Sequence, residues 1–330
     1  MMIENPTVQT SQDFLSQVNH EIAHFPFPAQ PQGLYEPISY VLAMGGKRIR
    51  PVFLLLAHQL YAQPSHKALQ AAVALEIFHN YTLLHDDLMD NADKRRDKPT
   101  VHKHWDANTA ILSGDAMLEV AYRHMFQAAS GCPDALAAFL KTCVEVSEGQ
   151  QYDMDFEQRL DVTLPEYYEM IRLKTGVLVA CALQVGALMG GADTAQSLLL
   201  YQYGAAIGRA FQLRDDYLDT FGDAAVFGKR IGGDILEGKK TFLLVSALEK
   251  ASTPLRREME QWLQRKDADE QEKIAYFTQI YKELGIPADY EREMERCFLK
   301  SDALFQQMDA PHEAKQALKS FADSLNHRIY

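Results

Sequence analysis

The sequence of 330 residues contains little cysteine and no cysteine spacing typical of a metal or redox site. Its four cysteines are Cys132, Cys143, Cys181 and Cys297. They stand in apolar surroundings, where cysteine behaves as a small core residue. Free thiols of this kind fit the reducing environment of the cytoplasm.

The sequence also lacks targeting and membrane-spanning signals. The N-terminus has no basic region followed by an apolar one, so no signal peptide is expected. The longest apolar run, Val177–Met189, is interrupted by Gln184 and is too short to cross a bilayer. These absences predict a soluble cytoplasmic protein without a transmembrane segment.

An excess of basic residues is missing too, because the formal net charge is −12 at pH 7. A chain this acidic implies no strongly basic face, so nucleic acid is not expected as a partner. The basic residues nevertheless form tight clusters, such as Lys47–Arg50 and Lys94–Arg96. Clusters of this kind in an acidic protein favour a small anionic ligand, although each taken alone also fits a solvated helix face.

No linker rich in proline, serine or glycine divides the chain, so residues 1–330 are predicted to form a single domain. Runs of alternating β-branched residues are scarce, and apolar residues recur at every third and fourth position. This helical period predicts an all-α fold. The longer helices are expected at about Ser11–Phe25, Asn108–Ser130, Asp134–Gln158, Leu164–Met189, Thr194–Thr220 and Ala288–Gln307.

Two short acidic stretches, Asp86–Asp90 and Asp215–Asp219, each read Asp-Asp-x-x-Asp. On a helix the first and last aspartates of such a stretch lie on one face. Like charges at this spacing destabilise a helix by about 0.2–0.5 kcal/mol per pair, so a compensating ligand is expected. Carboxylate oxygens suit Mg²⁺, which is commonly held by a few carboxylates together with substrate phosphate. The two stretches therefore predict a cleft that binds a diphosphate through magnesium.

A candidate anion site precedes the first acidic stretch, in Gly45–Pro51. The two glycines allow a tight turn with positive φ, and Lys47 and Arg50 then share a face of the helix that follows. Backbone N–H groups at a helix start favour an anion, and the two cations add to this. The alternative is a plain connection between helices with a charged first turn.

Further cations flank the first acidic stretch. His79 lies two turns before Asp86 on nearly the same face, where it is either a phosphate donor or a satisfied core histidine. Arg95 and Arg96 follow in a polar loop, where adjacent guanidinium groups can fork onto phosphate oxygens. Internal ion pairs with neighbouring aspartates are the alternative for these arginines.

Cations also accompany the second acidic stretch. Lys174 stands within an apolar helical segment, where a lysine is costly unless it is paired or reaches the surface, so it is a site candidate. The segment Phe221–Thr241 contains five glycines together with Lys229 and Lys239. This composition favours a mobile cationic flap that closes over a bound anion and excludes water.

In their order along the chain, these motifs resemble those of the trans-isoprenyl diphosphate synthases, also called polyprenyl synthetases. The likeness runs from about Gly33 to Lys240 and more loosely to the C-terminus. It comprises Gly-Gly-Lys-x-x-Arg-Pro, His-Asp-Asp-Leu-Met-Asp with Arg-Arg, Lys-Thr-Gly, Phe-Gln-x-x-Asp-Asp-x-x-Asp, and Gly-Lys with a further lysine. One Asp-Asp-x-x-Asp alone would be a weak signal, but the ordered series is specific.

The resemblance implies an isoprenoid synthase-type bundle of α-helices around a deep central cleft, usually in a homodimer. It implies three Mg²⁺ held between two facing aspartate motifs. The metal-binding aspartates would be Asp86, Asp87, Asp90, Asp215, Asp216 and Asp219. Of these, Asp86, Asp90 and Asp215 would ligate directly, with the others close by or behind them.

The implied reaction is the head-to-tail condensation of isopentenyl diphosphate with an allylic diphosphate. Isopentenyl diphosphate would contact Lys47, Arg50, His79 and Arg96. The allylic diphosphate would contact Arg95, Lys174, Lys229 and Lys239. Thr175 and Gln212 would face the developing allylic cation, and released diphosphate would take the proton. Asp97 stands where the family usually has glycine, but aspartate tolerates left-handed backbone, so the loop is expected to form.

Three residues on the helix before the first motif, Phe78, Tyr81 and Thr82, would lie one and two turns deeper than the metal. Similar synthases with an aromatic residue five positions before the motif tend to make short products. A fifteen- to twenty-carbon diphosphate is therefore expected, with twenty carbons favoured because Thr82 is small. The alternative is that the aromatic residues are ordinary core and that another helix sets the length.

Three other classes of protein share parts of this pattern. A class I terpene cyclase would carry an Asn/Ser/Glu motif in place of Asp215–Asp219. A di-iron helical bundle would use Glu-x-x-His pairs, and Glu21–His24 and Glu76–His79 match that spacing. A non-catalytic subunit of a heteromeric synthase would be expected to have decayed motifs, whereas these are intact.

Overall fold

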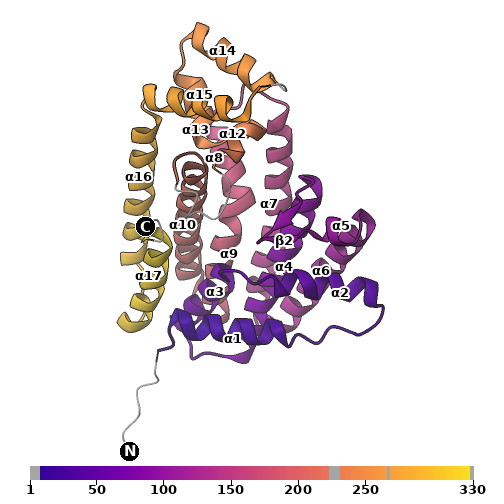
Figure 1. The fold of residues 1–330 in the computed structure, drawn as a ribbon. Coiled ribbons are helices and arrows are strands. Elements are labelled where there is room, and N and C mark those ends of the chain that lie inside the picture. The colour runs from indigo at the N-terminus through magenta and orange to yellow at the C-terminus, as the bar shows by residue number, and fades with distance from the viewer. Residues whose placement is uncertain (1–7, 223–230, 266–267, 328–330) are drawn as a thin grey trace, which may run out of the picture. The chain divides into compact units, whose positions relative to one another are not determined.

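The computed structural model describes residues 8–222, 231–265 and 268–327, and their regular structure is almost entirely helical (Figure 1). This confirms the all-α prediction. The exception in the described chain is a two-stranded antiparallel hairpin, β1 (Lys94–Arg95) and β2 (Lys98–Pro99), which forms the polar loop after the first acidic motif. The chain divides into two compact units, and the single-domain organisation stays a prediction.

Unit 1 consists of Met1–Leu140, Ala182–Leu198 and Asp309–Phe321. Its helices include α1 (Ser11–Ala23), α2 (Gln32–Ala43), α3 (Ile49–Gln59), α4 (His66–Met89), α5 (Val101–His104) and α6 (Ala107–Ala128). Parts of α7 (Pro133–Glu157), α9 (Val177–Met189), α10 (Thr194–Phe221) and α17 (His312–His327) complete it.

Helix α4 is the central element of unit 1 and carries the first acidic motif at its C-terminal end. The Ser65 hydroxyl caps its start by accepting the N–H of Ala68 at 3.1 Å. Nearly every side chain from Ala71 to Phe78 is buried, because α4 packs against both α3 and α6. A helix that is apolar on all sides is held inside a core, which fixes the position of the motif that follows.

Unit 2 consists of Lys141–Cys181, Leu199–Met308 and Ala322–Tyr330. Beside its parts of α7, α9, α10 and α17, it contains α8 (Leu164–Ile171), the π-helical turn η1 (Arg172–Gly176), α12 (Gly233–Glu237), α13 (Phe242–Lys250), α14 (Thr253–Gln264), α15 (Glu270–Glu283) and α16 (Ile286–Gln306). Its core is aromatic, with Phe156, Tyr167, Phe242, Phe277 and Tyr281 all buried. Tyr167 begins the link from this core to the second acidic motif on α10.

The predicted helix over Leu164–Met189 is continuous in space but not purely α-helical, because η1 interrupts it. The whole stretch has 26 residues and is long and apolar enough to cross a membrane by length and composition. The prediction that this apolar region is too short to cross a bilayer was therefore wrong by this criterion, because it counted only Val177–Met189. Most of its apolar window, 72%, is buried inside the protein, as in a core helix of a soluble protein.

The predicted flap, Phe221–Thr241, falls partly outside the described residues, including Lys229. The described remainder holds the short helix α12, which begins after Gly232 and ends at Gly238. Both glycines have positive φ, 86° and 68°, a conformation that costs glycine little and other residues more. The glycine content of the segment thus supports two turns around α12.

Candidate active site

The first aspartate motif ends α4 and is braced by the hairpin. Asp87 is buried, and Nε of Arg95 donates to both of its carboxylate oxygens at 2.8 Å. Burial raises the pKa of Asp87, and the Arg95 guanidinium acts in the opposite direction. Asp86 is partly exposed, and Asp90 is exposed at the end of the helix. Nη2 of Arg95 also lies 3.6 Å from Oδ2 of Asp86, so this arginine reaches two carboxylates of the motif, of which Asp86 keeps part of its surface exposed.

A basic turn precedes α3 in the same unit. Gly45 and Gly46 have φ values of 80° and 140°, as the sequence predicted for a tight turn. Nη1 of Arg50 lies 3.0 Å from Nε2 of His79 on α4. Because arginine can only donate, His79 accepts at Nε2 and is neutral. Burial, followed by the charge of Arg50, lowers the pKa of His79 well below its usual value. A neutral imidazole adds no second positive charge beside Arg50.

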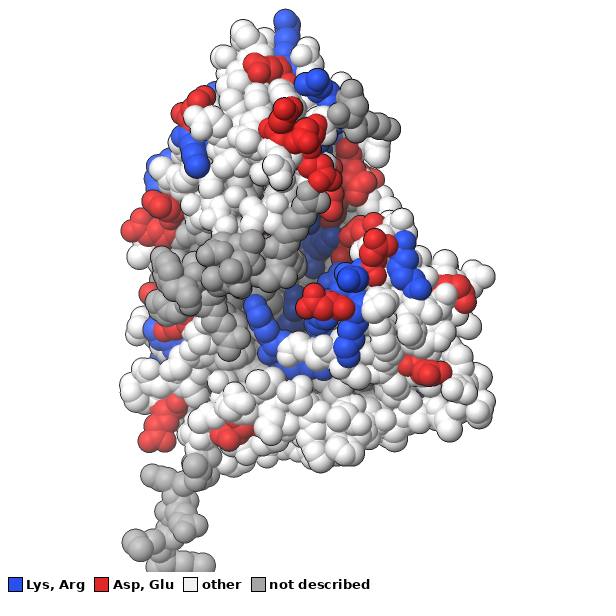
Figure 2. Space-filling view, in the orientation of Figure 1, with Lys and Arg blue, Asp and Glu red and all other residues white. Residues whose placement is uncertain are grey.

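The loop after the first motif lies against this basic turn. Nη1 of Arg96 donates to the carbonyl of Gly45, and a Cβ on Gly46 would lie 2.9 Å from the Arg96 guanidinium. The positive φ of Gly46 favours glycine there, and a side chain at this position would also displace the Arg96 guanidinium. Asp97 adopts a left-handed φ of 63°, as expected for an aspartate in place of glycine. Figure 2 shows lysine and arginine side chains gathered over the hairpin and the start of α3.

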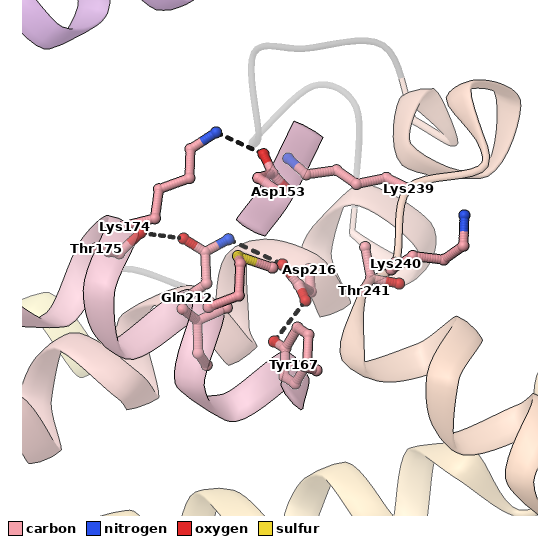
Figure 3. Close-up of a pocket in the computed structure, with 11 residues that line it drawn as sticks. Asp153, Tyr167, Lys174, Thr175, Gln212, Asp216, Lys239, Lys240 and Thr241 are labelled. Carbon is pink, nitrogen blue, oxygen red and sulfur yellow. Dashed lines mark hydrogen bonds and ion pairs between the residues drawn. The ribbon is translucent and has the colours of Figure 1, made fainter. Parts of the chain in front are cut away.

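The second motif lines a small cavity of about 40 Å³ in unit 2 (Figure 3). The cavity is lined by Asp153, Tyr167, Met170, Ile171, Lys174, Thr175, Gln212, Asp216, Lys239, Lys240 and Thr241. The Thr175 hydroxyl donates to Oε1 of Gln212 at 2.8 Å, and Nε2 of Gln212 donates to Asp216 at 2.9 Å. This chain of hydrogen bonds orients the amide and joins η1 to α10.

Asp216 is held as a buried acceptor. Its carboxylate accepts the Tyr167 hydroxyl at 2.7 Å and the N–H of Phe242 at 3.0 Å, beside the Gln212 amide. Burial, followed by the charge of Asp234, raises its pKa to about 7. Asp216 is therefore better suited to support the motif from behind than to ligate a metal in this geometry.

The other two aspartates of the second motif differ in exposure. Asp219 is buried and accepts the N–H of Asp234 at 2.9 Å. Burial, followed by the charge of Asp234, raises the pKa of Asp219 to about 6. Asp215 is partly exposed and precedes both of these supported residues on α10. Asp215 is thus the member of this motif that is most open to a ligand.

Lysines flank the cavity through ion pairs. Nζ of Lys174 lies 2.6 Å from Oδ2 of Asp153, and Nζ of Lys239 lies 3.8 Å from Oδ1 of Asp234. The Lys174 and Lys239 side chains therefore both reach carboxylates near the second motif. Lys240 is buried and donates to the carbonyl of Gly238 at 2.9 Å.

Sequence reasoning missed four contributors, namely Asp153, Lys240, Arg48 and Glu76. Asp153 is an acidic residue within a long helix where no spacing marks it, and the Glu-x-x-His spacing of Glu76 indicated a metal ligand rather than the partner of Arg48. Lys240 ends the stretch that resembles the family, but no role was predicted for it. Arg48 was part of the basic cluster, and its burial could not be foreseen from its neighbours. Lys229, a predicted diphosphate ligand, lies outside the described residues.

The donor set fits a metal that is shared with a substrate. Among residues 8–222, 231–265 and 268–327, no group of three or more histidine, cysteine or acidic side chains is poised to hold a metal by itself. Asp86 and Asp90 in unit 1, and Asp215 in unit 2, are at least partly exposed carboxylates. Their hard oxygen donors suit Mg²⁺ when phosphate oxygens supply further ligands. Such partial sites are what a metal bridging to a diphosphate requires.

The three residues predicted to set product length lie together in unit 1. Phe78 is buried, with its ring centroid 5.6 Å from that of Tyr81 and 5.6 Å from that of Phe139. The Thr82 hydroxyl donates to the carbonyl of His79 at 2.8 Å. The three side chains therefore follow one side of α4 below the first motif, and their effect on product length stays a prediction.

An all-α fold with two aspartate motifs, each flanked by cations, defines a class of proteins that bind diphosphates. Comparison with known proteins narrows this class. The family profile for polyprenyl synthetase matches residues 31–281. The chain therefore belongs to the polyprenyl synthetase family.

Relatives and solved structures agree with this assignment. A geranylfarnesyl diphosphate synthase from Natronomonas pharaonis is 35% identical, covering 95% of this chain and 96% of its own. A geranylgeranyl diphosphate synthase from Saccharolobus solfataricus is 34% identical, covering 94% of each. A crystal structure of a geranylgeranyl pyrophosphate synthase superposes with a TM-score of 0.90 at 40% identity, covering 98% of this chain and all of the other.

One further structure carries ligands. A polyprenyl synthase from Caulobacter crescentus, complexed with calcium and isoprenyl diphosphate, is 27% identical with a TM-score of 0.86, covering 98% of this chain and all of the other. Family membership sets aside the terpene cyclase. The di-iron interpretation fails as well, because Glu76 forms a buried ion pair with Arg48 and His79 accepts a hydrogen bond from Arg50.

Proposed function

We propose that this protein is a short-chain trans-prenyl diphosphate synthase. It condenses isopentenyl diphosphate with an allylic diphosphate and releases diphosphate. The observation that carries this proposal is the hydrogen-bonded chain Thr175–Gln212–Asp216 beside Lys174. This chain places oriented dipoles and a cation next to the second aspartate motif. The synthases named among the relatives support the reaction class.

The protein's own residues have distinct roles in this proposal. Three Mg²⁺ held by Asp86, Asp90 and Asp215, when bound, would supply Lewis-acid activation of the leaving diphosphate. Lys174 and Lys239 would neutralise that diphosphate. Nearby Asp87, Asp216 and Asp219 would hold the motifs in place, since their carboxylates already accept hydrogen bonds from the protein.

The dipoles beside the cavity would then stabilise positive charge. The Thr175 hydroxyl donates a hydrogen bond to Gln212, so the lone pairs of the hydroxyl oxygen remain available to a cation. A preorganised oxygen of this kind stabilises a developing charge without reorganisation. The proton lost at the end would pass to the released diphosphate, because the reaction then needs no protein base.

On the other side of the reaction, isopentenyl diphosphate would bind the basic turn of unit 1. Lys47 is exposed, and the neutral His79 beside the Arg50 guanidinium adds no second positive charge that would repel it. Arg96 is carried to the same turn by its bond to Gly45. Guanidinium groups fork onto phosphate oxygens, which favours this cluster as the diphosphate site.

The test is a condensation assay with purified protein, Mg²⁺, isopentenyl diphosphate and each of dimethylallyl, geranyl and farnesyl diphosphate. We expect a fifteen- to twenty-carbon product, metal dependence and release of diphosphate. The same assay with a chelator, and with Ca²⁺ in place of Mg²⁺, identifies the metal required. Absence of product with every allylic primer at saturating Mg²⁺ would refute the proposal.

We also propose that the protein is a cytoplasmic homodimer in which the two units act as one domain. The support for a dimer is that α6 exposes large apolar side chains, Leu112 at 61% and Phe126 at 62%. Exposed apolar side chains on one helix favour an interface. Light scattering of the wild type and of Leu112→Asp–Phe126→Asp tests this, because the variant is expected to be monomeric.

A further inference from the structure

A second cavity lies in unit 2, away from the residues of the proposed reaction. It has a volume of about 290 Å³ and is formed by α8, η1, α10 and α16. It is lined by Pro165, Tyr168, Glu169, Arg172, Ala205, Ala206, Arg209, Glu293, Arg296, Cys297 and Lys300. None of these residues lines the cavity of Figure 3. The two cavities therefore use different faces of α8 and α10.

The charges of this second cavity are layered. Glu293 is buried with 8% of its side chain exposed, and it binds both Arg209 and Arg296. The Arg296 side chain is 78% exposed, so this cation lies outside the carboxylate that holds it. The lining carries four basic and two acidic side chains, although the whole chain has a net charge of −12. The cavity is thus a local positive region in an acidic protein.

Arg209 is prepared for a further acceptor. Its guanidinium carbon lies 3.7 Å from the centroid of the Tyr168 ring, which holds the planar group in a cation–π contact. Its Nε is buried and has no hydrogen-bond partner within the part of the chain that the structure describes. A buried donor without a partner is costly, so an acceptor brought by a ligand would stabilise this arrangement.

The rest of the lining indicates the size and character of that ligand. Arg172 is held by two bonds of 2.8 Å to Glu169, which orient its guanidinium at the cavity wall. Pro165, Ala205 and Ala206 add small apolar surface. At about 290 Å³ the cavity lies at the lower edge of the volumes of ligand pockets, about 300–1,000 Å³, which suits a charged head with no more than a short apolar chain.

We infer that this cavity is a second binding site for a small organic diphosphate. Its anionic head would contact Arg209, Arg296 and Lys300, because guanidinium and ammonium groups donate to phosphate oxygens. A short hydrocarbon chain would lie on the apolar surface. The choice of diphosphate as the ligand rests on the proposed function, whose substrates and products are of this class; inorganic diphosphate shares the same head.

The second cavity shares α8, η1 and α10 with the cavity of Figure 3. Arg172 is the first residue of η1, the turn that presents Lys174 and Thr175. Tyr168 is adjacent to Tyr167, whose hydroxyl binds Asp216. A ligand in this cavity would therefore contact the same elements, α8, η1 and α10, that position the second motif.

Calorimetry with inorganic diphosphate and with geranyl diphosphate, in a chelator, tests the site. The background protein is Lys47→Ala–Arg50→Ala, which weakens the proposed isopentenyl diphosphate site. In this background we expect one equivalent of diphosphate still to bind at the second cavity. Adding Arg296→Gln and Lys300→Gln should lower that affinity at least about tenfold, a loss of about 1.4 kcal/mol. Tighter binding of geranyl diphosphate than of inorganic diphosphate, lost when Arg296→Gln and Lys300→Gln are added, would identify the organic ligand of this cavity, and equal losses for both would identify the inorganic one.

Two further variants keep the outcome interpretable. Arg159→Gln is the matched control, since Arg159 forms ion pairs with Asp161 and Glu166 on the same unit but does not line the cavity. It should bind as the background protein does. Arg209→Lys keeps the charge but loses the planar fork, and should weaken binding without unfolding the protein.

Unchanged affinity after Arg296→Gln–Lys300→Gln, with circular dichroism showing intact helix content, would overturn the inference. Condensation activity separates it from the proposed function. Arg296→Gln–Lys300→Gln in the otherwise wild-type protein should keep its basal condensation rate. A protein that binds diphosphate at this cavity but condenses no substrate would refute the proposed function and leave the second site standing.

Discussion

Arg48 and Glu76 form a buried ion pair, with Nη1 and Oε1 2.7 Å apart and only 3% of each side chain exposed. Arg48 adopts a left-handed φ of 47° at the start of α3, a conformation that costs a residue with a side chain roughly 1–2 kcal/mol. Its guanidinium also donates to the carbonyl of Leu42 at 2.8 Å and to Asn19 at 3.2 Å. Arg48 lies between Lys47 and Arg50 in the basic turn, so its ion pair with Glu76 attaches this turn to α4.

Removing one partner of this pair should destabilise the protein strongly. Glu76→Ala leaves the Arg48 charge buried without its partner, so we expect a loss of about 3–5 kcal/mol in the free energy of unfolding. Asn80 would lose an acceptor as well, since it donates to Oε1 of Glu76 at 3.1 Å. Urea denaturation of the full-length variant and of the full-length wild type measures this loss.

The control for that prediction is the paired replacement Arg48→Met–Glu76→Leu, which buries no charge. It should recover much of the stability, because a well-packed apolar pair often replaces a buried ion pair at little cost. Equal stability of Glu76→Ala and the wild type would show that the pair does not hold the turn.

A glycine should be required where α7 meets η1. A Cβ on Gly149 would approach the backbone nitrogen of Lys174 more closely than 3.0 Å, a distance that real Cβ atoms essentially never show. Gly149→Ala should therefore cost about 1–3 kcal/mol and lower kcat, because η1 must move away and carries Lys174 and Thr175 with it. Gly131→Ala is the matched control, since its Cβ would meet no atom within 4 Å. Thermal unfolding and steady-state kinetics should separate the two variants; equal effects would contradict the packing argument.

The two aspartate motifs and the basic turn should have separable kinetic effects. Asp86→Ala or Asp215→Ala should lower kcat about a hundredfold or more, since each removes an oxygen donor for the metal that activates the leaving group. Lys47→Ala should instead raise KM for isopentenyl diphosphate about ten- to a hundredfold, because it removes a charged hydrogen bond. Near-normal turnover of Asp215→Ala would show that the second motif is not catalytic.

The aromatic residues below the first motif should limit product length. In Tyr81→Ala, and more so in Phe78→Ala–Tyr81→Ala, a floor of aromatic rings is replaced by open space. We expect longer prenyl chains, read by chromatography of the products after hydrolysis of the diphosphate. Thr82→Ser is the control, because it keeps the hydroxyl that donates to His79. An unchanged product in the active double variant would locate the floor elsewhere.

Stability should fall with decreasing pH as His79 becomes protonated in the unfolded chain. Its pKa in the folded protein lies well below 6.5, so below pH 6.5 the unfolded state binds a proton that the folded state does not. The free energy of unfolding should therefore fall by up to about 1.4 kcal/mol per pH unit from this residue. His58 and His124 also have lowered pKa values and act in the same direction.

The contribution of His79 is isolated by comparing the wild type with His79→Gln in urea titrations between pH 5 and pH 7. The variant should show the smaller slope of stability against pH. Equal slopes would mean that His79 titrates alike in the folded and unfolded states, and that its neutral role beside Arg50 is wrong.

Much of this site was predictable, because its motifs depend on residue types at short, fixed spacings. Two carboxylates four residues apart share a helix face whatever surrounds them, so Asp86–Asp90 and Asp215–Asp219 could be recognised directly. Gly45 and Gly46 predicted a tight turn for the same reason, since only their backbone freedom was needed. The helical period of the apolar residues likewise predicted the all-α class.

Residues whose roles depend on partners far away in the chain could not be read in this way. Asp153 meets Lys174 across 21 positions, and Glu76 meets Arg48 across 28, so no local pattern identifies the partner of either acid. The π-helical form of η1 was also missed, because its sequence is compatible with an ordinary α-helix.

The sequence by itself determined the helical class, the two acidic motifs and the cations that flank them, because these follow from spacing and residue chemistry alone. Tertiary structure alone decided which members of each motif stay open. Asp87 is buried against Arg95, and Asp216 is buried against Tyr167 and Gln212. Asp86, which Arg95 also reaches at 3.6 Å, and Asp215 remain partly exposed. Three aspartates of one motif are chemically identical in sequence, and only burial and neighbouring donors give them different tasks.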